Sequence, residues 1–166
     1  MTIRKAKPEE YAKALDFYYS VSDAMEGLPY RVTWRRGVYP IAEDLIGDLF
    51  LAVSEDDEII GAILVNDRQG EGYETGIWAV KTDKVAVTHL IAVSPDHRGE
   101  GIGRKLLDQA RESVRDWADV IRLDTLANNT PAKRLYESFG FHKTGDIEVE
   151  YESIGVKQFS LYECAL

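Results

Sequence analysis

The segment from Val85 to Leu126 constrains the fold more than any other part of the chain. Two apolar runs, Val85–Val93 and Val120–Leu126, flank a glycine-rich turn and a stretch with apolar residues at helical spacing. The first run stops at Ser94-Pro95, where proline removes a hydrogen-bond donor from a strand. The apolar residues of the helical stretch are Ile102, Leu106, Leu107, Ala110, Val114 and Trp117. We therefore predict a strand, an amphipathic helix and a second, parallel strand in a βαβ crossover at the centre of the sheet.

The remaining sequence divides into shorter patterns of the same kinds. Strand patterns occur at 2–6, 50–53, 59–65, 144–151 and 156–163, helical patterns at 8–25, 41–48 and 130–139, and a flexible, glycine-containing connection at 67–76. Thr130-Pro131 predicts the start of the last helix, with threonine as its cap, and Gly140 predicts its left-handed end. We predict one α/β domain (mixed α+β) over residues 1–166. Its central mixed, mostly antiparallel sheet has about six to seven strands and is flanked by about four helices.

Charge and cysteine content exclude several classes of function. The 166 residues carry 20 Lys+Arg against 29 Asp+Glu, a net charge of −9, whereas non-specific binding to nucleic acid or anionic membranes needs a positive surface. We expect no nucleic-acid and no membrane partner, and a cationic substrate suits the charge. Cys164 is the lone cysteine and no Cys/His cluster has metal-ligand spacing, so no metal and a reducing, cytoplasmic setting are expected. Residues 1–10 are polar, and no apolar run approaches the roughly 20 residues that span a bilayer.

The glycine-rich turn is the most informative candidate site. Gly99, Gly101 and Gly103 alternate between a strand and a helix, and Arg98 and Arg104 flank them. Glycines let a backbone approach a ligand closely, and N–H groups at a helix start form an anion cradle that the helix dipole strengthens. This pattern predicts a pyrophosphate site; the alternative is that the glycines only allow tight packing of the helix on the sheet. The spacing differs from the Gly-x-Gly-x-x-Gly dinucleotide fingerprint, and the Gly-Lys-Ser/Thr of a P-loop is absent.

Two signatures in this half of the chain resemble those of the GNAT-type N-acetyltransferase superfamily. Arg98, Gly101 and Gly103 match its acyl-CoA-binding pattern Arg/Gln-x-x-Gly-x-Gly/Ala, directly after an apolar strand. Downstream, residues 129–141 (NTPAKRLYESFGF) resemble that family's later helix. The order of predicted elements agrees over the whole chain, whereas the motifs themselves cover only residues 85–141.

The resemblance implies acetyl-CoA as cosubstrate, no metal, and a splayed strand pair that binds CoA. The pyrophosphate would lie on the backbone N–H groups of the glycine turn, and the pantetheine arm would run beside the strand that ends at Val93. A bulge that splays this strand would leave backbone groups of Ile91 and Val93 for the arm, and the side chain of Asn129 would contact it. The implied cofactor-binding residues are Ile91, Val93, Arg98, Gly99, Gly101, Ile102, Gly103, Arg104, Asn129 and Tyr136.

The resemblance also implies a catalytic mechanism, in which a neutral amine attacks the thioester directly. Tyr136 aligns with the family's general acid, which protonates the leaving thiolate. From the residues alone, Tyr136 is equally a core aromatic on the helix face of Leu135 and Phe139. His89, on the long strand, has a suitable ordinary pKa for the general base, although an isolated strand histidine is commonly packed or solvated.

The predicted activity is transfer of an acetyl group from acetyl-CoA to a primary amine of a small molecule, a peptide or a protein. The alternatives are a non-catalytic acyl-CoA-binding or regulatory module with the same fold and a nucleotide-phosphate binder. Retention of Tyr136 and Asn129 favours the enzyme, since a pure binder needs no acid for a thiolate. A homodimer is compatible with the resemblance. The acceptor pocket carries no readable signature; its candidate aromatic residues, which equally suit a core, are Trp34, Tyr39, Tyr73 and Trp78.

Overall fold

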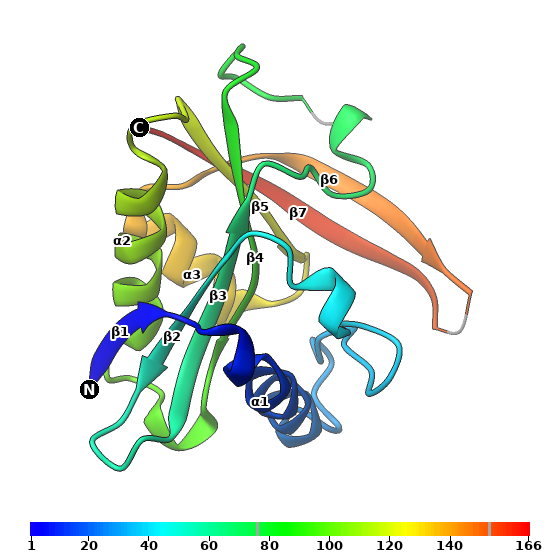
Figure 1. Cartoon of the computed structure of the whole chain (residues 1–166). Helices are drawn as coiled ribbons and strands as arrows, with labels where there is room; N and C mark the ends of the chain where they lie inside the picture. Colours follow the sequence, from blue (N-terminus) through cyan, green and yellow to red (C-terminus); the bar gives the residue numbers. More distant parts are fainter. Residues whose placement is uncertain (76, 153) are drawn as a thin grey trace. The chain divides into compact units, whose positions relative to one another are not determined.

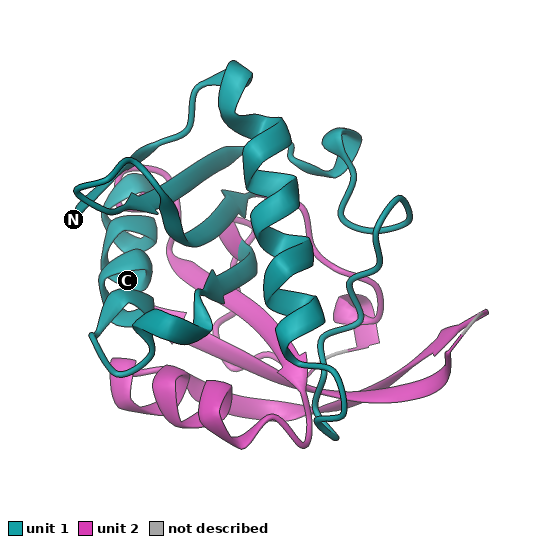
Figure 2. Cartoon of the chain, turned by 90° about the horizontal axis from the view of Figure 1, so that it is seen from below, with its two compact units in different colours: residues 1–66, 88–113 teal, residues 67–87, 114–166 magenta. Residues whose placement is uncertain are grey.

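The computed structural model describes residues 1–75, 77–152 and 154–166, so Gly76 of the predicted connection lies outside the described residues. The chain separates into two compact units, which Figure 2 colours separately. Unit 1 comprises residues 1–66 and 88–113, and unit 2 comprises residues 67–87 and 114–166. The described strands, labelled in Figure 1, follow the hydrogen-bonded order β1-β2-β3-β4-β5-β7-β6. Strand β4 (Val85–Val93) contributes residues 85–87 to unit 2 and the rest to unit 1.

Unit 1 is built from antiparallel strands, the second part of β4 and the helices α1 and α2. With η denoting a 3₁₀ turn, its elements are β1 (Thr2–Lys5), η1 (Pro8–Glu10), α1 (Tyr11–Ala24), η2 (Ala42–Asp44), β2 (Asp48–Val53), β3 (Ile59–Asn66), η4 (Pro95–His97) and α2 (Ile102–Val114, whose last residue belongs to unit 2). Antiparallel pairing joins β1 to β2 and β2 to β3. Tyr18 of α1 and Leu51 and Leu64 of the strands lie buried in one apolar core, whose removal from water is the main stabilising contribution.

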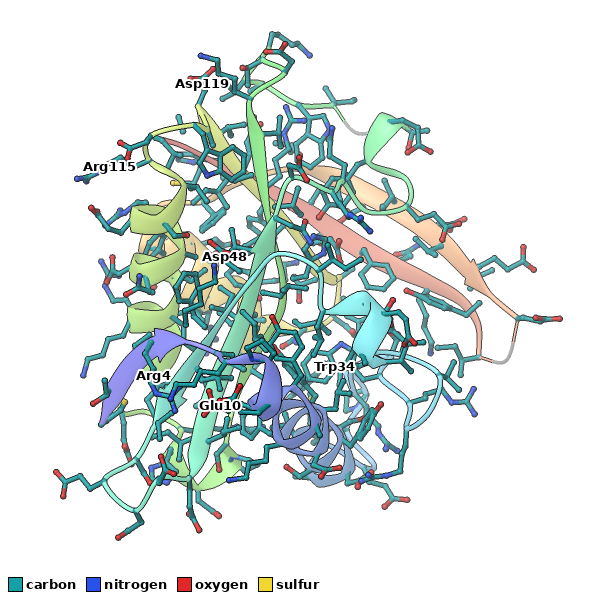
Figure 3. The ribbon with its side chains drawn as sticks, in the orientation of Figure 1. Arg4, Glu10, Trp34, Asp48, Arg115 and Asp119 are labelled. Carbon is teal, nitrogen blue, oxygen red and sulfur yellow. The ribbon has the colours of Figure 1, made fainter. Side chains whose placement is uncertain are left out.

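The start of the first helix is fixed by hydrogen bonds to one carboxylate. Pro8 opens η1, where a missing N–H costs little, and Glu10 accepts the Lys7 N–H at 2.9 Å. Arg4 of β1 donates to both carboxylate oxygens of Glu10, at 2.7 and 2.6 Å (Figure 3). The hydrogen bond from Arg4, and then that from Lys7, lowers the pKa of Glu10 to about 2. The carboxylate therefore stays charged and ties η1 to β1.

Gly61 of β3 marks a close approach of α2 to the strands of unit 1. A methyl group added there would lie 2.8 Å from Ile102 Cγ2 and 3.1 Å from Leu106 Cδ1. We expect Gly61→Ala to lower the free energy of unfolding by about 1–3 kcal/mol through overpacking, as measured by urea unfolding. Gly145→Ala is the matched control, because a methyl group there meets nothing within 4 Å, and should change stability by less than about 0.5 kcal/mol. Equal stability of both variants would contradict this packing.

Unit 2 contains a β5–β7–β6 ladder and the helix α3. Its elements are η3 (Tyr73–Thr75), β5 (Val120–Leu126), α3 (Thr130–Phe139), β6 (His142–Tyr151) and β7 (Gly155–Ala165), together with the first residues of β4. Strand β7 pairs antiparallel with both β5 and β6. Residues 85–87 of β4 pair in parallel with residues 120–122 of β5. One apolar cluster of this unit surrounds Tyr73, Trp78 and Leu161, and another surrounds Phe159.

The predicted fold class is confirmed, including the parallel β4–β5 pair of the βαβ crossover. The helix predicted at 41–48 is wrong, because this segment forms the single turn η2. Asp44 bonds back to the Ile41 N–H at 2.8 Å, which closes one turn, and Leu45 leaves the helical region with ψ 53°. The described residues hold the α-helices α1, α2 and α3 rather than about four. A single domain over residues 1–166 stays a prediction.

The helix after the glycine turn is also shorter than predicted. It ends at Val114, whose carbonyl accepts hydrogen bonds from the N–H groups of both Trp117 and Ala118. Two donors on one carbonyl belong to a closing turn rather than to a continuing helix. The Trp117 side chain is 42% exposed and does not belong to the apolar helix face.

Candidate active site

The glycine-rich turn lies in unit 1 between η4 and α2. Gly99 and Gly101 have φ angles of +84° and +75°, a conformation that residues with a Cβ avoid. Lys105 N–H bonds the Gly101 carbonyl at 3.1 Å, and the first turn of α2 starts at Ile102. The N–H groups of a first turn have no acceptor within their own helix, and the helix dipole adds positive potential there. The turn therefore presents backbone donors at a site of positive potential.

The space around the glycines separates the two explanations for them. A methyl group added at Gly99 or at Gly101 would meet no other atom within 4 Å. Tight packing requires glycine elsewhere, at Gly61, where α2 comes close. Gly103 is buried in the first turn of α2. Gly99 and Gly101 thus leave open space over the backbone that side chains would fill, whereas the diphosphate site stays a prediction.

Strand β4 changes its backbone conformation in the middle. Leu90 has φ +53°, in the left-handed region, which costs a non-glycine residue about 1–2 kcal/mol. A left-handed residue within a strand is a feature of β-bulges. The parallel ladder with β5 covers residues 85–87, so Ile91 and Val93 lie beyond it, and both are partly exposed. Their backbone contacts to a pantetheine arm stay a prediction.

His89, the candidate general base, is tied to Asn66 of β3. Its Nε2 lies 2.9 Å from Asn66 Oδ1, and Asn66 Nδ2 donates to the Ile46 carbonyl at 2.8 Å. Because that amide nitrogen is the donor, Oδ1 is the acceptor, and the hydrogen of His89 lies on Nε2. In this arrangement Nε2 cannot take up a proton, so a role of His89 as base would require Nδ1.

Asn129 of unit 2 is the N-cap of α3. Its Oδ1 accepts the Ala132 N–H at 3.2 Å. The predicted cap, Thr130, is wrong and is the first helical residue instead, because the non-helical backbone angles that a cap needs occur at Asn129 (φ −81°, ψ 77°). The cap uses the oxygen of the carboxamide, whereas the predicted contact to the pantetheine arm would use its NH₂ group.

These two roles of Asn129 are separable by substitution. Asn129→Asp keeps a capping oxygen and loses the amide donor, whereas Asn129→Ala loses both. We expect the alanine variant to lose about 1 kcal/mol of unfolding free energy and the aspartate variant to lose none. Both should bind acetyl-CoA about tenfold more weakly, by loss of one hydrogen bond. Thermal unfolding and calorimetry measure the two effects, and wild-type affinity in Asn129→Asp would restrict Asn129 to capping.

Tyr136 projects from α3 into an aromatic cluster of unit 2. Its side chain is 3% exposed, and its ring centroid lies 6.0 Å from those of Phe141 and Tyr162. Burial, followed by the charges of Asp124 and Tyr162, raises the pKa of Tyr136 above its usual value. The hydroxyl therefore keeps its proton at neutral pH, as a general acid must. Core packing and acid catalysis are compatible for this residue.

Sequence reasoning missed a buried ion pair that anchors the connection after β3. Arg122 and Glu163 occupy opposed positions of β5 and β7, with Nε and Oε2 3.6 Å apart. Glu163 Oε1 accepts the N–H groups of Ala79 and Val80 at 2.6 and 3.1 Å, and Arg122 donates to the Val80 carbonyl at 2.9 Å. The one available signal was a charged residue within each of two apolar strands, which does not reveal the partner.

Two of the four candidate cleft aromatics are core residues. Trp78 is 7% exposed, and its Nε1 hydrogen is donated to the Tyr73 carbonyl at 2.9 Å. The Arg122 guanidinium carbon lies over the Trp78 ring, 4.2 Å from the ring centroid. Tyr73 is 2% exposed and donates its hydroxyl to Asp124 Oδ2 at 2.8 Å. Sequence reasoning had not selected Asp124. In unit 1, Trp34 is partly buried and its ring packs edge-on against Tyr18.

The described part of the chain offers no metal centre. It contains no group of three or more His, Cys, Asp or Glu side chains placed to hold an ion. None of its helices is long and apolar enough to cross a bilayer.

The strand β4, the glycine turn, α2 and the capped helix α3 are the elements that hold the two signatures. Residues 12–141 match the model of the acetyltransferase (GNAT) family. The chain therefore belongs to the acetyltransferase (GNAT) family, as the two signatures predicted.

Three curated relatives are identical to this chain at about a third of the aligned positions. Streptothricin acetyltransferase of Escherichia coli is 32% identical over 111 residues, 64% of this chain and 58% of that protein. L-amino acid N-acyltransferase MnaT of E. coli strain K12 is 31% identical over 90 residues, 51% of this chain and 52% of that protein. N-alpha-acetyltransferase RimI of Mycobacterium tuberculosis is 33% identical over 73 residues, 44% of this chain and 45% of that protein. The matches thus span about half the length of these relatives.

Solved structures share the fold over nearly the whole chain. A GNAT-family acetyltransferase from Streptococcus agalactiae superposes with a TM-score of 0.79 at 21% identity, covering 99% of this chain and 95% of that one. Arabidopsis thaliana NAA60, in complex with acetyl-CoA, superposes with a TM-score of 0.71 at 15% identity, covering 99% of each chain. At these identities the likeness establishes the fold.

Proposed function

We propose that the protein is an N-acetyltransferase that transfers an acetyl group from acetyl-CoA to a primary amine of a small molecule, a peptide or a protein. The observation that carries this proposal is the open backbone surface at Gly99 and Gly101, at the N-terminus of α2. Among the relatives, one is named for acyl transfer to L-amino acids and another for N-alpha-acetylation, which supports an amine acceptor. A homodimer and a cytoplasmic location stay predictions.

The residues proposed to hold acetyl-CoA act mostly through their backbone. The N–H groups of the turn and of the first turn of α2 face the diphosphate, and the guanidinium groups of Arg98 and Arg104 add positive charge. Backbone groups of Ile91 and Val93 bond the pantetheine arm, and the side chain of Asn129 contacts it. The turn residues are Arg98, Gly99, Gly101, Ile102, Gly103 and Arg104.

Tyr136 is the proposed general acid. Bound acetyl-CoA supplies a thioester carbonyl that the acceptor nitrogen attacks and a thiolate that leaves. Tyr136 gives its hydroxyl proton to the sulfur, whose ordinary pKa is about 8.5, as the C–S bond breaks. It regains a proton from the newly acylated nitrogen, so the residue ends the cycle unchanged. A backbone N–H of β4 donates to the developing oxyanion, an interaction worth roughly 3–4 kcal/mol in other enzymes.

Release of free thiol from acetyl-CoA tests this function. The purified protein is incubated with acetyl-CoA and with alkylamines, L-amino acids or a peptide with a free N-terminus. Released thiol is measured, and acetylated products are identified by mass spectrometry. We expect saturable turnover and an acetylated product with at least one of these amine classes. Tight CoA binding without turnover on any amine would support the non-catalytic acyl-CoA-binding module. Displacement of CoA by equimolar ATP would support the nucleotide binder.

A further inference from the structure

The strand β6 of unit 2 leaves one long edge of its ladder open. In the order of the described strands β6 comes last and pairs with β7 alone. The β6–β7 hairpin extends past β5 (Figure 1), whose ladder with β7 ends where Leu126 is opposed to Phe159. Residues 148–151 and 155–158 of the hairpin therefore form a two-stranded ribbon. Such a ribbon is marginally stable in water, and a third strand stabilises it.

The register shows which residues of β6 direct their backbone toward the open edge. The Ala127 N–H bonds the Gln158 carbonyl at 2.9 Å, so the backbone groups of Gln158 face β5. Backbone groups of successive strand residues point to opposite sides. Those of Phe159 consequently face β6, where Ile147 is opposed to it. By the same alternation, the β6 residues whose N–H and C=O groups face the open edge are Asp146, Glu148 and Glu150.

These three residues also form an acidic row on one face of the hairpin. Side chains alternate between the two faces of a strand, so the three carboxylates share a face, and all three residues are exposed. The other face is apolar and carries Ile147, Val149 and Tyr151, which pack with Phe159. A strand added at the open edge would therefore meet a carboxylate at every second position and an apolar side chain in between.

The negative charge of the acidic row is greatest on the two-stranded ribbon. Asp146, at the inner end of the row, accepts a hydrogen bond from the ammonium group of Lys143 at 3.0 Å. Glu148 accepts one at 3.3 Å from Gln158, whose side chain is neutral, and Glu150 lies beyond it on the same exposed face. Cationic side chains of a partner would therefore compensate Glu148 and Glu150 more than Asp146.

A second copy of the chain does not fit this edge. In an antiparallel pair, residues whose backbone groups face the partner lie directly opposite each other. Two β6 edges would thus place the acidic positions 146, 148 and 150 of one copy against those of the other. Like charges directly opposite each other destabilise a strand pair. The acidic row therefore protects the edge from self-pairing, as charged side chains commonly do, and attracts a basic strand.

We propose that the open edge of β6 binds an extended segment of a partner protein in which basic and apolar residues alternate. The segment adds to the ladder as an antiparallel strand and bonds the backbone groups of Glu148 and Glu150. Its basic side chains lie beside the two carboxylates, since opposite charges across a strand pair stabilise it. Its apolar side chains extend the row of Val149 and Tyr151. This binding is independent of the proposed acetyl transfer.

A blocked peptide of alternating arginine and valine, RVRVRVR, tests the proposal. It has no primary amine, so it is not an acceptor in the proposed acetyl transfer. The control peptide RRRRVVV has the same composition and charge without the alternation. By calorimetry, we expect the wild-type protein to bind the alternating peptide about tenfold more tightly than the control peptide, because only the alternating peptide places arginines on one face and valines on the other.

The double substitution Glu148→Gln and Glu150→Gln tests the acidic row while it keeps the size of both side chains. We expect it to weaken binding of the alternating peptide about tenfold, through loss of two cross-strand charge pairs. The matched control, Glu55→Gln with Glu58→Gln, removes the same charge from two exposed residues between β2 and β3. It should stay within about twofold of wild type. Equal losses in the two variants, or none in the first, would overturn the proposal.

Hydrogen exchange of the wild-type protein tests the same edge without any substitution. At saturating alternating peptide, we expect the amide hydrogens of Asp146, Glu148 and Glu150 to exchange about tenfold more slowly. Those of Ile147 and Val149 face β7 and should keep their rates. Unchanged exchange at the three acidic positions, equal affinities for the two peptides, or no binding at millimolar peptide would overturn the proposal. Each of these outcomes leaves the proposed acetyl transfer untouched.

Discussion

Replacing Gly101 with glutamate is expected to raise the Kd for acetyl-CoA by about a thousandfold. The new side chain would project into the open space over the turn, where an added Cβ meets nothing within 4 Å, and its carboxylate would repel the diphosphate. Loss of two charge-assisted hydrogen bonds, at about 2 kcal/mol each, amounts to about 4 kcal/mol and so to about a thousandfold. Isothermal calorimetry with acetyl-CoA measures the effect.

Gly27→Glu is the control for the added negative charge and for the backbone strain of Gly101→Glu. Gly27 also has a positive φ, +81°, with nothing within 4 Å of an added Cβ, so both variants carry the same charge change and a similar backbone cost of about 1–2 kcal/mol. We expect Gly27→Glu and Gly101→Glu to lose similar amounts of unfolding free energy. Only Gly27→Glu should keep the wild-type affinity for acetyl-CoA. An affinity of Gly101→Glu within about tenfold of wild type would place the diphosphate elsewhere.

Tyr136→Phe is expected to lower kcat by about 100- to 1000-fold without changing the Kd for acetyl-CoA. Phenylalanine keeps the ring contacts with Phe141 and Tyr162, so the variant loses the hydroxyl alone. Without a nearby proton donor the thiolate must leave unprotonated, and general-acid catalysis commonly contributes a factor of this size. Thiol release at saturating acetyl-CoA gives kcat, and calorimetry gives Kd.

Tyr162→Phe is the control for loss of a hydroxyl within the same cluster. The Tyr162 hydroxyl donates to Glu137 Oε1 at 2.9 Å, and its removal should leave kcat within about twofold to threefold of wild type, since it is not a proposed proton donor. Equal turnover by Tyr136→Phe and wild-type protein would remove Tyr136 from the mechanism.

Features with local signals could be predicted from the sequence. The parallel strands around the glycine turn follow from apolar runs and a proline stop, and Gly140 ends α3 with φ +118° as a left-handed cap. The positive φ angles at Gly99 and Gly101 likewise agree with a motif that can be read from consecutive residues. Each of these signals depends on the residue types of near neighbours, which the sequence displays directly.

The remaining features depend on strand register and on competition between side chains. Tyr73 and Asp124 are 51 residues apart, and Arg122 meets Glu163 only because β5 and β7 pair in one particular register. No composition or spacing rule reveals such partners. The false helix at 41–48 failed because the Asp44 side chain bonds the backbone and so closes a single turn.

In the function that we propose, backbone amides of the glycine turn bind the diphosphate of acetyl-CoA. At 18.7 kDa, the protein is suited to amide chemical-shift mapping with two ligands, CoA and pantetheine, which lacks the diphosphate. We predict that CoA shifts the amide resonances of Gly99, Gly101 and Gly103 and that pantetheine leaves them in place. Saturable CoA binding with these three resonances unmoved, or no binding at millimolar CoA, would contradict it.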